Sequence, residues 1–580
     1  MSCVVALPTF CSRSRRCWPR LLAVLLVAGL VSAASSGPAA AHEGHHGPDD
    51  STEQALEGKI QVATGYVFHD TNGNRRRDAG EPGLPDVRVS NGSDIVRTDA
   101  EGRYELKVDD DQILFVIKPR NWKTPVNQNQ LPQFYYIHKP AGSPDSHFPG
   151  VEPTGPLPDS VDFPLYPNDE PDTFRALLFG DTQPRNLKEV DYITHDVVAQ
   201  IVREEGHDAS FGVTLGDIAF DDLNTMEPLN RAIALIGIPW YNVIGNHDLN
   251  YDSPDDEHSD ETFERIYGPS YYSFDYGAVH FMVLDDVRWT GGENGQRGKY
   301  HGGLGETQME FIRNDLAMIP ENQLVVLMMH IPLVNVEDRH ELYRLIEQRP
   351  FSLSFSAHTH YMEHRFIGEE DGWQGPEPHH HVINVTACGS WWRGAPDENG
   401  IPHATMSDGG PNGYSIISFD GHQYSLEFRA ARRPAHHQMN IHVPYEIAAD
   451  ATAETEVLVN VFAGSERSKT EIRFSADGPW VPMERVVRSD PYFEELKQRE
   501  AALAERLPVK EGQKVGANLP WIALPGAHAT EHLWQAMLPA EMPVGIATID
   551  VRTTDMSGKT YTDQRSIRIT EPAQATAGSR

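Results

Sequence analysis

Five short strings in the middle of the chain carry the side chains that could do chemistry. They are FGDTQ with Asp181 and Gln183, LGD with Asp217, IGNHD with Asn246, His247 and Asp248, MMH with His330, and SAHTH with His358 and His360. Each string is rich in the oxygen and nitrogen donors that metal ions bind in proteins. Together they offer enough ligands for two metal ions in one pocket, an arrangement suited to hydrolysing a phosphate ester.

Taken one at a time, these residues have simpler explanations. Asp181 or Asp217 alone could be a turn residue or a helix N-cap. His330 alone, after the apolar run VVLMM, could be a buried histidine that hydrogen-bonds the backbone. The set is different, because Asp, Asn and His at the ends of apolar strands are costly to bury unless something pairs them. The set therefore favours a dinuclear metal site.

Strand-like apolar runs carry these strings, and helical stretches alternate with the runs. The runs span residues 174–181, 209–217, 238–248, 278–286, 323–330 and 351–360. Apolar residues recur at helical spacing over residues 187–206, 226–237, 306–319 and 337–348. Alternating strands and helices predict an α/β domain. Such sheets place their sites outside the carboxyl ends of the strands, which is where the ligand strings fall.

The sequence on both sides of this α/β domain is mostly β in pattern. Residues 58–168 alternate apolar and polar residues in short runs separated by Gly, Asn, Asp and Pro, which predicts an all-β N-terminal module. Residues 141–173 are rich in Pro, Asp and Gly, as is typical of a linker. Short β-runs return over 426–570, with one helical stretch at 492–507, and predict a β-rich C-terminal domain.

The N-terminal module contains an acidic loop with the spacing of a calcium site. Five residues match positions 1, 3, 5, 9 and 12 of an EF-hand-type loop, namely Asp70, Asn72, Asn74, Asp78 and Glu81. Arg75 stands at position 6, where Gly is usual. The surrounding sequence resembles small β-sandwich modules of bacterial surface proteins that use such loops. A calcium site and a metal-free hairpin turn both remain open.

In chain order, the five strings resemble the motifs of the calcineurin-like metallophosphoesterases: D-x-[H/Q], GD, GNHD, a lone His after a strand, and a final H-x-H. The resemblance covers about residues 174–425 and includes the strings CGSWWRG and DGGPNGY. The flanking β domains resemble those of an exported bacterial subgroup. The resemblance implies an α/β fold with a central metallophosphoesterase β-sandwich flanked by helices, and a metal-dependent phosphoric ester hydrolase activity.

The resemblance also implies which residues hold which metal ion. One ion takes Asp181, Gln183, Asp217 and His360, and the other takes Asp217, Asn246, His330 and His358. Asp217 bridges the two, since each of its carboxylate oxygens can hold one cation. Oxygen and imidazole ligands without thiolate suit Mn, Fe, Zn or a mixture. Two cations about 3.5–4 Å apart can lower the pKa of a bridging water, and the resulting hydroxide would attack phosphorus in line.

The IGNHD string supplies two further residues with implied catalytic roles. In the resemblance His247 does not bind metal but lies near the leaving-group oxygen, where an imidazole can donate a proton. Asp248 is expected to orient His247, as a carboxylate commonly orients a functional imidazole. Two positions depart from the pattern. Gln183 replaces the commoner His and is a weaker ligand, and Phe220 stands where purple acid phosphatases carry a metal-bound Tyr.

Substrate contacts are expected from residues near the ligand strings. Arg185 and Arg393 could each grip a phosphate oxygen bidentately. Trp391 and Trp392 could stack on a base or sugar or cover a choline-like head group, or could instead be core between two domains. Asn412, in DGGPNGY, is expected to be a turn residue near the pocket.

Two other polar groups are expected not to bind metal. His379, His380 and His381 follow Pro and Glu and are expected to be solvated in a loop. Asp221 and Asp222 are expected to be surface groups or to support the site without being ligands.

The first 41 residues have the features of a signal peptide. Four arginines between residues 13 and 20 precede an apolar run at 21–34, and residues 39–41 offer an Ala-Ala-Ala cleavage site, with Val31-Ser32-Ala33 as an alternative. Residues 14–20 resemble a twin-arginine export signal, with an ordinary basic region as the alternative. After cleavage only Cys388 remains of the 4 cysteines, so no internal disulfide could form. We expect an exported protein, periplasmic or secreted.

The charge of the chain limits its partners. Its 49 basic and 84 acidic residues give a net charge of -35, which repels nucleic acid and anionic membranes. No stretch after the signal peptide is long and apolar enough to span a bilayer. We therefore expect a small phosphorylated substrate, no nucleic-acid specificity, no membrane span and no obligate protein partner.

These features predict an exported phosphoesterase with two metal ions. A diester leaves a poor alkoxide and would make His247 more valuable, so we favour a phosphodiesterase over a phosphomonoesterase such as a phosphatase or nucleotidase. A hypothesis of another class is a non-catalytic surface-binding protein that retains the fold. The β modules and the calcium-like loop favour that hypothesis a little, whereas the intact ligand set opposes it.

Overall fold

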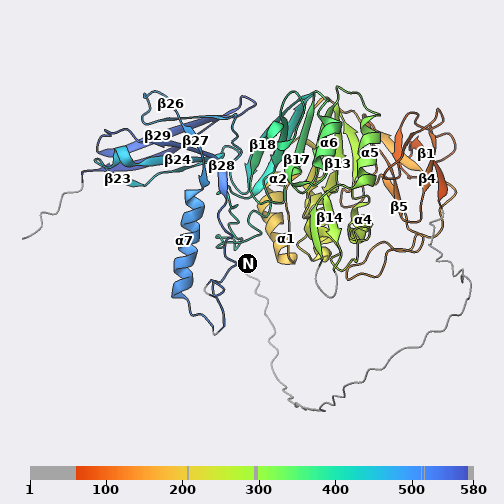
Figure 1. Cartoon of the computed structure of the whole chain (residues 1–580), viewed down its shortest axis with the longest axis horizontal. Helices are drawn as coiled ribbons and strands as arrows, with labels where there is room; N and C mark the ends of the chain where they lie inside the picture. The colour runs from red at the N-terminus through yellow and green to blue at the C-terminus, as the bar shows by residue number, and fades with distance from the viewer. Residues whose placement is uncertain (1–59, 205–207, 293–297, 511, 515, 573–580) are drawn as a thin grey trace, which may run out of the picture. The chain divides into compact units, whose positions relative to one another are not determined.

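The computed structural model describes residues 60–204, 208–292, 298–510, 512–514 and 516–572 (Figure 1). The predicted signal peptide, residues 1–41, lies outside these described residues. Within them, no helix has both the length and the apolar character needed to cross a membrane. Three β-rich parts follow one another along the described chain, and the central part also carries most of the helices.

The N-terminal module consists of two four-stranded sheets. One has the order β4 (Arg103–Val108), β1 (Gln61–His69), β8 (Phe163–Pro167) and β6 (Trp122–Lys123). The other has the order β3 (Ile95–Arg97), β2 (Arg88–Ser90), β5 (Gln112–Val116) and β7 (Tyr135–His138). Val67 of the first sheet and Leu114 of the second are fully buried in one core, as in a β-sandwich.

The central domain contains two larger sheets. The five-stranded sheet has the order β11 (Trp240–Val243), β10 (Ala209–Leu215), β9 (Thr173–Phe179), β20 (Gly413–Asp420) and β21 (Gln423–Ala430). The six-stranded sheet has the order β12 (Tyr272–Tyr276), β13 (Val279–Val283), β16 (Leu324–Met328), β17 (Ser352–Ser356), β19 (His379–Ile383) and β18 (Glu363–Ile367). Leu178 and Phe281, one from each sheet, belong to the same buried core.

The parallel strands of these two sheets decide where a site can form. Strands β9, β10 and β11 run parallel, and so do β13, β16, β17 and β19. Their carboxyl ends therefore meet at one edge of each sheet. Strands β9, β10, β11, β13, β16 and β17 coincide with the six predicted strand-like runs, which confirms the α/β prediction.

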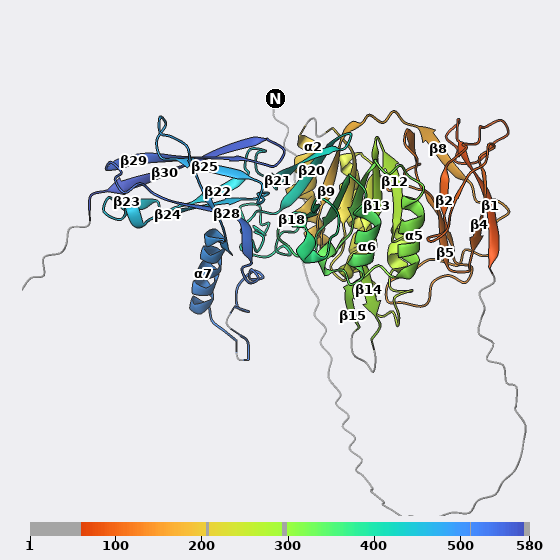
Figure 2. The same ribbon diagram turned by 45° about the horizontal axis from the view of Figure 1, so that its top comes forward.

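Short helices connect the strands of the central domain. They are α1 (Leu187–Ile193), a π-helical turn (Thr194–Val198), α2 (Ala199–Arg203), α3 (Met226–Ile233), α4 (Glu261–Tyr267), α5 (Glu306–Leu316) and α6 (Arg339–Ile346). The first three elements fill the single helix predicted over 187–206, and the Asn186 side chain caps it by accepting from the amides of Lys188 and Glu189. Helices α5 and α6 lie side by side in both views (Figures 1 and 2).

Several shorter elements complete the central domain. Strand β14 (Val287–Thr290) pairs antiparallel with β15 (Lys299–Gly302). Single 3-10 turns occur at Leu223–Thr225, Ala234–Ile236, Asn246–Asp248, Leu333–Asn335 and Glu369–Asp371. Helix α4 was not predicted, because its 7 residues lie in an acidic stretch without clear helical spacing of apolar residues.

The C-terminal domain also has two sheets. One has the order β22 (Met439–His442), β24 (Glu456–Val461), β28 (Ala529–Met537) and β27 (Glu484–Ser489). The other has the order β23 (Glu446–Ala448), β30 (Thr560–Thr570), β29 (Gly545–Thr554), β25 (Lys469–Arg473) and β26 (Val481–Pro482). A 3-10 turn lies at Thr452–Glu454 and helix α7 at Pro491–Arg506. Strand β21 continues the central sheet to Ala430, beyond residue 425, where the central domain was predicted to end.

Arg88 of the N-terminal module enters a buried charge cluster in the central domain. Its Nη1 lies 2.6 Å from Asp315 and its Nη2 lies 2.7 Å from Asp275. His280 lies between the same two carboxylates, with Nδ1 2.7 Å from Asp275 and Nε2 3.0 Å from Asp315. Ser273 donates a further hydrogen bond to Asp315. Because buried charges are costly unless paired, this cluster binds the two parts of the chain together.

Candidate metal centre

The structure places all seven predicted metal ligands just beyond strands of the central domain. In chain order they are Asp181, Gln183, Asp217, Asn246, His330, His358 and His360, and they follow β9, β10, β11, β16 and β17. All are buried except His358, which is half-buried. So many polar side chains among apolar strands need partners that satisfy them.

One group of donor atoms converges on His330. Its Nε2 lies 3.1 Å from Asn246 Oδ1, 3.2 Å from Asp217 Oδ1 and 3.1 Å from His358 Nδ1. Asp217, His330 and His358 each offer a ligand atom within 4.8 Å of the others. These four residues are the set predicted for one metal ion. A cation among them would satisfy several lone pairs at once.

The second predicted group contains a buried oxygen without a partner. Asp181 is fully buried, and among the described residues nothing hydrogen-bonds its Oδ1. His360 Nε2 lies 3.5 Å from that oxygen. Gln183 Nε2 donates to Asp217 Oδ2 at 2.7 Å, so the Gln183 amide would turn to offer Oε1 to a cation. An orphaned carboxylate oxygen beside an imidazole nitrogen fits a metal ligand.

Backbone carbonyls hold two of the histidine rings. His330 Nδ1 donates to Leu215 O at 2.9 Å, and His360 Nδ1 donates to Gly389 O at 2.5 Å. Each bond leaves Nε2 free to act as a ligand. Burial lowers the pKa of His360 to about 3, and burial with the neighbouring His330 charge lowers the pKa of His358 to about 4. Both rings are therefore neutral, the form that binds metal.

The charge balance of the site also favours cations. Burial raises the pKa of Asp181 well above its ordinary value, and Asp217 adds to that effect. Burial disfavours ionised Asp217 as well, but the neighbouring histidines, His330 first, together outweigh burial and lower the pKa of Asp217. Burial likewise disfavours charged His330, yet Asp217 raises the pKa of His330 to about 10. Two buried carboxylates thus share one cationic ring, and the donor set fits a dinuclear centre.

Backbone strain is concentrated at the ligands. The left-handed residues include Asp181 (φ 31°), Gln183 (φ 35°), Asp217 (φ 49°), His358 (φ 70°) and His360 (φ 57°). Such conformations are unfavourable for residues other than Gly and tend to occur at functional sites. The glycine before Asn246 is also required, because a Cβ on Gly245 would lie 2.0 Å from Asp217 N.

His247 lies beside Asp217 without joining the ligand group. Its backbone N–H donates to Asp217 Oδ1 at 2.8 Å, and its ring Nδ1 lies 2.6 Å from Asp221 Oδ1. The ring stacks on Phe220, with centroids 4.4 Å apart. Burial opposes the charge of His247, but Asp217 and Asp221 together raise its pKa. The ring is therefore held at Nδ1, with Nε2 as its other proton-carrying atom.

The prediction that Asp248 orients His247 is wrong. The fully buried Asp248 carboxylate accepts from the amides of Ile218 at 3.0 Å, Ala219 at 2.8 Å and Gly245 at 2.9 Å. These bonds hold the Asp217 and Asn246 turns against each other, so Asp248 shapes the site through the backbone. Asp221, expected to be a surface or supporting group, is the carboxylate that contacts the ring.

The predicted substrate residues fall into two classes. Trp392 is buried and donates its Nε1 proton to Thr182 O at 3.2 Å, so it is a core residue. Trp391 is half-buried and lies over His360, with ring centroids 3.8 Å apart. Arg393 lies 4.9 Å from the Trp391 ring centre, and within the described structure its buried Nε has no hydrogen-bond partner. Trp391 and Arg393 thus lie beside the ligand group, and their contact with a substrate stays a prediction.

The other two predicted substrate residues are already engaged. Arg185 Nη1 bonds Trp391 O at 2.7 Å and Glu189 at 3.1 Å, and its guanidinium lies 4.5 Å from the Phe220 ring centre. Asn412 is buried, and its Nδ2 donates to Asp196 at 2.8 Å and to Ala387 O at 3.0 Å. The Asn412 amide therefore fixes a turn and is not directed at a ligand.

Sequence reasoning missed two buried groups next to the ligands. Cys388 Sγ lies 3.7 Å from both Gln183 Oε1 and His360 Nδ1. Asp286 Oδ1 accepts from the amides of His330 at 3.0 Å and Ile331 at 3.1 Å. Asp286 ends the predicted strand-like run at 278–286, and that position was its only signal in the sequence.

The predicted calcium loop is closed by its own hydrogen bonds. Asn72 Nδ2 and Asn74 Nδ2 both donate to Asp78 Oδ2 at 2.7 Å. Asp70 accepts from the amides of Gly73 and Arg75 and from Tyr166 Oη, while Glu81 accepts from the amides of Thr71 and Asp78. Asn72, Asn74 and Asp78 are thus joined through their side chains, while Asp70 and Glu81 bond mainly the backbone of the loop, and calcium binding stays a prediction.

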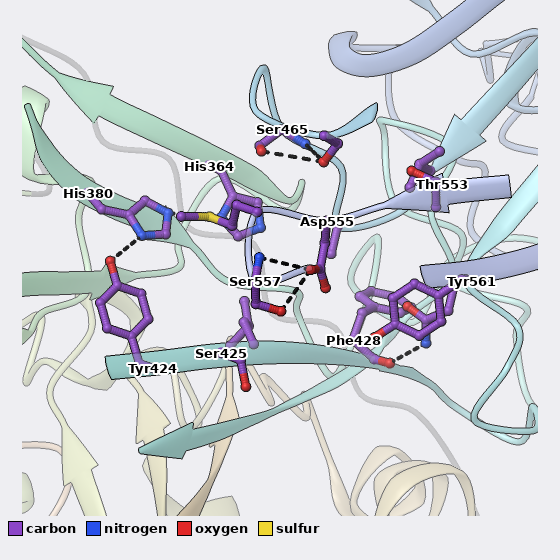
Figure 3. A pocket seen from close by; sticks show the side chains of 16 residues that line it. His364, His380, Tyr424, Ser425, Phe428, Ser465, Thr553, Asp555, Ser557 and Tyr561 are labelled. Atoms are coloured by element: carbon purple, nitrogen blue, oxygen red, sulfur yellow. Dashed lines mark hydrogen bonds between the residues drawn. The ribbon is translucent and has the colours of Figure 1, made fainter. Parts of the chain in front are cut away.

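The prediction that His379, His380 and His381 are solvated is wrong, because all three are buried in β19. His380 faces a cavity of about 100 Å³ between the central and C-terminal domains, where its Nδ1 bonds Tyr424 Oη at 2.8 Å (Figure 3). His364 Nδ1 bonds His380 Nε2 at 2.9 Å. The cavity lining includes none of the predicted metal ligands.

His379 and His381 belong to an alternating hydrogen-bonded ladder with three serines of β17. In order, its members are Ser352, His379, Ser354, His381 and Ser356, linked at 2.9, 2.7, 2.7 and 2.9 Å. Leu333 N–H donates to His381 Nε2 at 3.4 Å, so in the neutral ring Nδ1 carries the proton. Each member of the ladder then donates a hydrogen bond to the next, in the order Ser356, His381, Ser354, His379 and Ser352. It fixes β17, the strand that ends next to His358.

Three sequence-family models match the chain. The calcineurin-like phosphoesterase model matches residues 174–362, the N-terminal model of calcineurin-like phosphoesterase matches 70–150, and the C-terminal model matches 381–561. A solved purple acid phosphatase from yellow lupin (Lupinus luteus) seeds is similar at 13% identity, with 60% of this chain and 67% of that chain covered and a TM-score of 0.32. No curated protein matches.

The three model matches cover the catalytic part and both flanking parts. The catalytic match contains Asp181, Asp217, Asn246, His330 and His360, the residues that converge in the structure. The alternative of a non-catalytic binding protein is therefore not retained. The chain belongs to the calcineurin-like phosphoesterase family and is a metal-dependent phosphoric ester hydrolase.

Proposed function

We propose that the site hydrolyses small phosphodiesters, with His247 giving a proton to the departing oxygen. The supporting observation is the placement of His247, whose backbone amide bonds Asp217 and whose Nδ1 bonds Asp221. A diester expels an alkoxide, a poor leaving group that gains much from a positioned proton donor. A ring held at Nδ1 beside the ligand group is suited to that step.

The chain's own residues would divide the work as follows. Asp181, Gln183, Asp217 and His360 would hold one ion, and Asp217, Asn246, His330 and His358 the other. When bound, two ions of Mn, Fe or Zn supply Lewis acidity at the phosphoryl oxygens and a water of lowered pKa. Asp217 suits the bridging place because its Oδ1 faces His330 and its Oδ2 faces Gln183.

Arg393 and Trp391 would bind the substrate outside the metal ligands. The Arg393 Nε proton is buried without a partner among the described residues, and a phosphate oxygen would accept it. Trp391 lies over His360 and offers an aromatic surface to the ester group. A small ester fits this arrangement, and the net charge of -35 disfavours a polyanionic polymer.

The experiment compares a diester with a monoester and a good leaving group with a poor one. With Mn added, we expect greater kcat/KM for bis-p-nitrophenyl phosphate than for p-nitrophenyl phosphate. His247→Asn should slow a phenyl diester by about 100-fold, and the p-nitrophenyl diester much less, because only the poorer leaving group needs a proton.

Greater kcat/KM on the monoester would instead assign the site to phosphomonoesters, the alternative that the same ligands allow. Equal losses for both leaving groups would remove the proton-donor role from His247.

We also propose that the protein is exported, on the strength of the basic and apolar segments before residue 42. N-terminal sequencing of protein recovered outside the cytoplasm should then begin at His42. Recovery only inside the cytoplasm, with Met1 retained, would contradict export.

A further inference from the structure

We propose a second kind of metal site, in which a divalent transition cation such as Zn²⁺ joins the N-terminal module to the central domain. The three ligands are Asp111 from the turn between β4 and β5, His258 from the loop before α4, and Glu261, the first residue of α4. One ligand atom from each lies within 4.8 Å of the others. None of the three belongs to the catalytic ligand set.

The His258 ring has the surroundings of a metal ligand. Its Nδ1 lies 2.8 Å from Asp255 Oδ1, so an outer carboxylate orients the ring. Metal-binding histidines commonly donate their other N–H to a carboxylate in this way. Nε2 is then directed towards Asp111 Oδ2 at 3.9 Å. That separation is too long for a hydrogen bond.

The same separation suits a shared cation. Metal bonds of about 2.0–2.2 Å to nitrogen and oxygen place tetrahedral ligand atoms roughly 3.4 Å apart. The Asp111 and His258 side chains are partly exposed, so each can make the small movement required. A cation between Asp111 Oδ2 and His258 Nε2 therefore needs no change in the fold.

An independent observation in favour of the site is that one carboxylate oxygen of Glu261 is buried without a hydrogen-bond partner among the described residues. The residue is 1% exposed, and its Oε1 has no hydrogen-bond partner among the described residues. Its Oε2 is already engaged by Lys139 at 2.6 Å and by Ser143. A buried carboxylate oxygen without a partner is rare and costly, and a cation would satisfy it.

Lys139 does not neutralise the region by itself. It contacts Asp111 Oδ1 at 2.9 Å, Glu261 Oε2 at 2.6 Å and Glu264 at 3.2 Å, which are three carboxylates for one ammonium group. The lysine thus takes one oxygen of Asp111 and one of Glu261, and the other oxygen of each is left for a second cation. Oxygen and imidazole donors of this kind suit Zn²⁺.

Crystals of the full mature chain with Zn²⁺ provide the first test. Anomalous difference maps at the zinc edge should show a peak between Asp111, His258 and Glu261, in addition to peaks at the catalytic residues. The catalytic peaks are the internal positive control. Peaks there with none at His258 would overturn this proposal and leave the catalytic one intact.

Metal content in solution provides the second test. After equilibration with Zn²⁺ and removal of the excess, His258→Gln and Glu261→Gln should each hold one equivalent less per chain than the wild type. Asp110→Asn is the matched control, since the exposed Asp110 is the neighbour of Asp111. All variants should keep phosphoesterase turnover, which reports that they fold. Equal zinc content in all four proteins would overturn the site.

Thermal unfolding measures whether Zn²⁺ bound between the N-terminal module and the central domain stabilises the folded protein. Zn²⁺ should raise the melting temperature of the wild type and of Asp110→Asn by more than that of His258→Gln, because a cation that binds only the folded state stabilises it. The same rise in all three proteins would mean that zinc acts only at the catalytic residues.

Discussion

His247 Nδ1 lies 2.6 Å from Asp221 Oδ1, and this contact, not the adjacent Asp248, sets the orientation of the ring. Asp221 can make the contact because it adopts a left-handed conformation, with φ 63°. Its backbone N–H also bonds His247 O at 3.3 Å. Two residues separated by 26 positions therefore form one unit beside Asp217.

Asp221→Asn should weaken proton donation without unfolding the site. Asn tolerates the left-handed conformation, so the turn survives while the carboxylate is lost. We expect kcat for a phenyl diester to fall by about 10-fold or more, as for other partners that orient a functional imidazole. Asp222→Asn is the control and should keep kcat, since its side chain caps only the Leu223–Thr225 turn. Equal losses in both variants would contradict the assignment.

Asn246→Ala should remove a metal ligand. Asn246 Oδ1 is one of the three atoms around His330 Nε2, and alanine offers no replacement. We expect metal content to fall and turnover to drop by about 100-fold or more. The exposed Asn224→Ala serves as the control. Turnover that resists both this substitution and strong chelators would show that the reaction does not depend on these ligands.

Arg393→Ala should impair substrate binding more than the chemical step. The guanidinium lies next to Trp391, outside the ligand set. Loss of one charge-assisted contact made equally in ground and transition states raises KM by about 10-fold and leaves kcat similar. The measurement is a full kinetic comparison with Arg433→Ala, whose side chain is exposed. A fall in kcat alone would place Arg393 in the chemical step instead.

Arg88→Met should loosen the N-terminal module. Removing Arg88 from the buried ion cluster leaves Asp275 and Asp315 to share the single charge of His280, which costs about 3–5 kcal/mol of the free energy of unfolding. Arg97→Met is the matched control, because the Arg97–Asp86 pair is exposed, at 39% and 76%, and contributes less than about 1 kcal/mol. Urea denaturation of both variants measures the difference. Similar losses would mean that burial of the cluster has no special weight.

The same cluster should make stability depend on pH at both ends. Burial opposes the charge of His280, but Asp315 and Asp275 raise its pKa, so its contribution is complete below the ordinary histidine value of 6.5 and is lost as pH rises through the raised pKa. Burial also opposes ionised Asp315, but His280 and Arg88 lower its pKa to about 2. The contribution of Asp315 to stability is present above pH 3.8, its ordinary pKa, and is lost as pH falls towards 2.

Urea midpoints across this pH range, for the wild type and His280→Gln, provide the measurement. The stability advantage of the wild type should shrink as pH rises above 6.5, since glutamine does not titrate. A constant advantage at all pH values would contradict a charged His280 in the folded state.

The strands, and the meeting of the predicted ligand residues at their ends, could be predicted because both leave local signals. Each ligand follows an apolar run, and parallel runs bring their carboxyl ends together whatever the rest of the fold does. The partner of His247 could not be predicted in this way. Asp248 is its neighbour in sequence, but three backbone amides already hold that carboxylate, and only the folded turn at Asp221 reveals the alternative.

The buried histidines of β19 were misread for a different reason. Pro and Glu before His379 suggested a loop, and histidine is less often fully buried than the aliphatic residues of a typical core strand. The signal that could have corrected this is a shared period of two. Ser352, Ser354 and Ser356 alternate along β17 as His379 and His381 do along β19, so parallel pairing places hydroxyls against imidazoles.

The hydrogen-bonded ladder of serines and histidines between β17 and β19 limits which substitutions this protein can tolerate. The Ser354 hydroxyl hydrogen-bonds both His379 Nε2 and His381 Nδ1, so its loss would leave both buried nitrogen atoms without that partner. Replacing the serines and histidines of the ladder by apolar residues would require several simultaneous substitutions. Each single substitution would leave a buried polar group without a partner and give a less stable protein. We therefore expect the serines and histidines of the ladder to vary little among related proteins, even where the surrounding apolar residues are substituted freely.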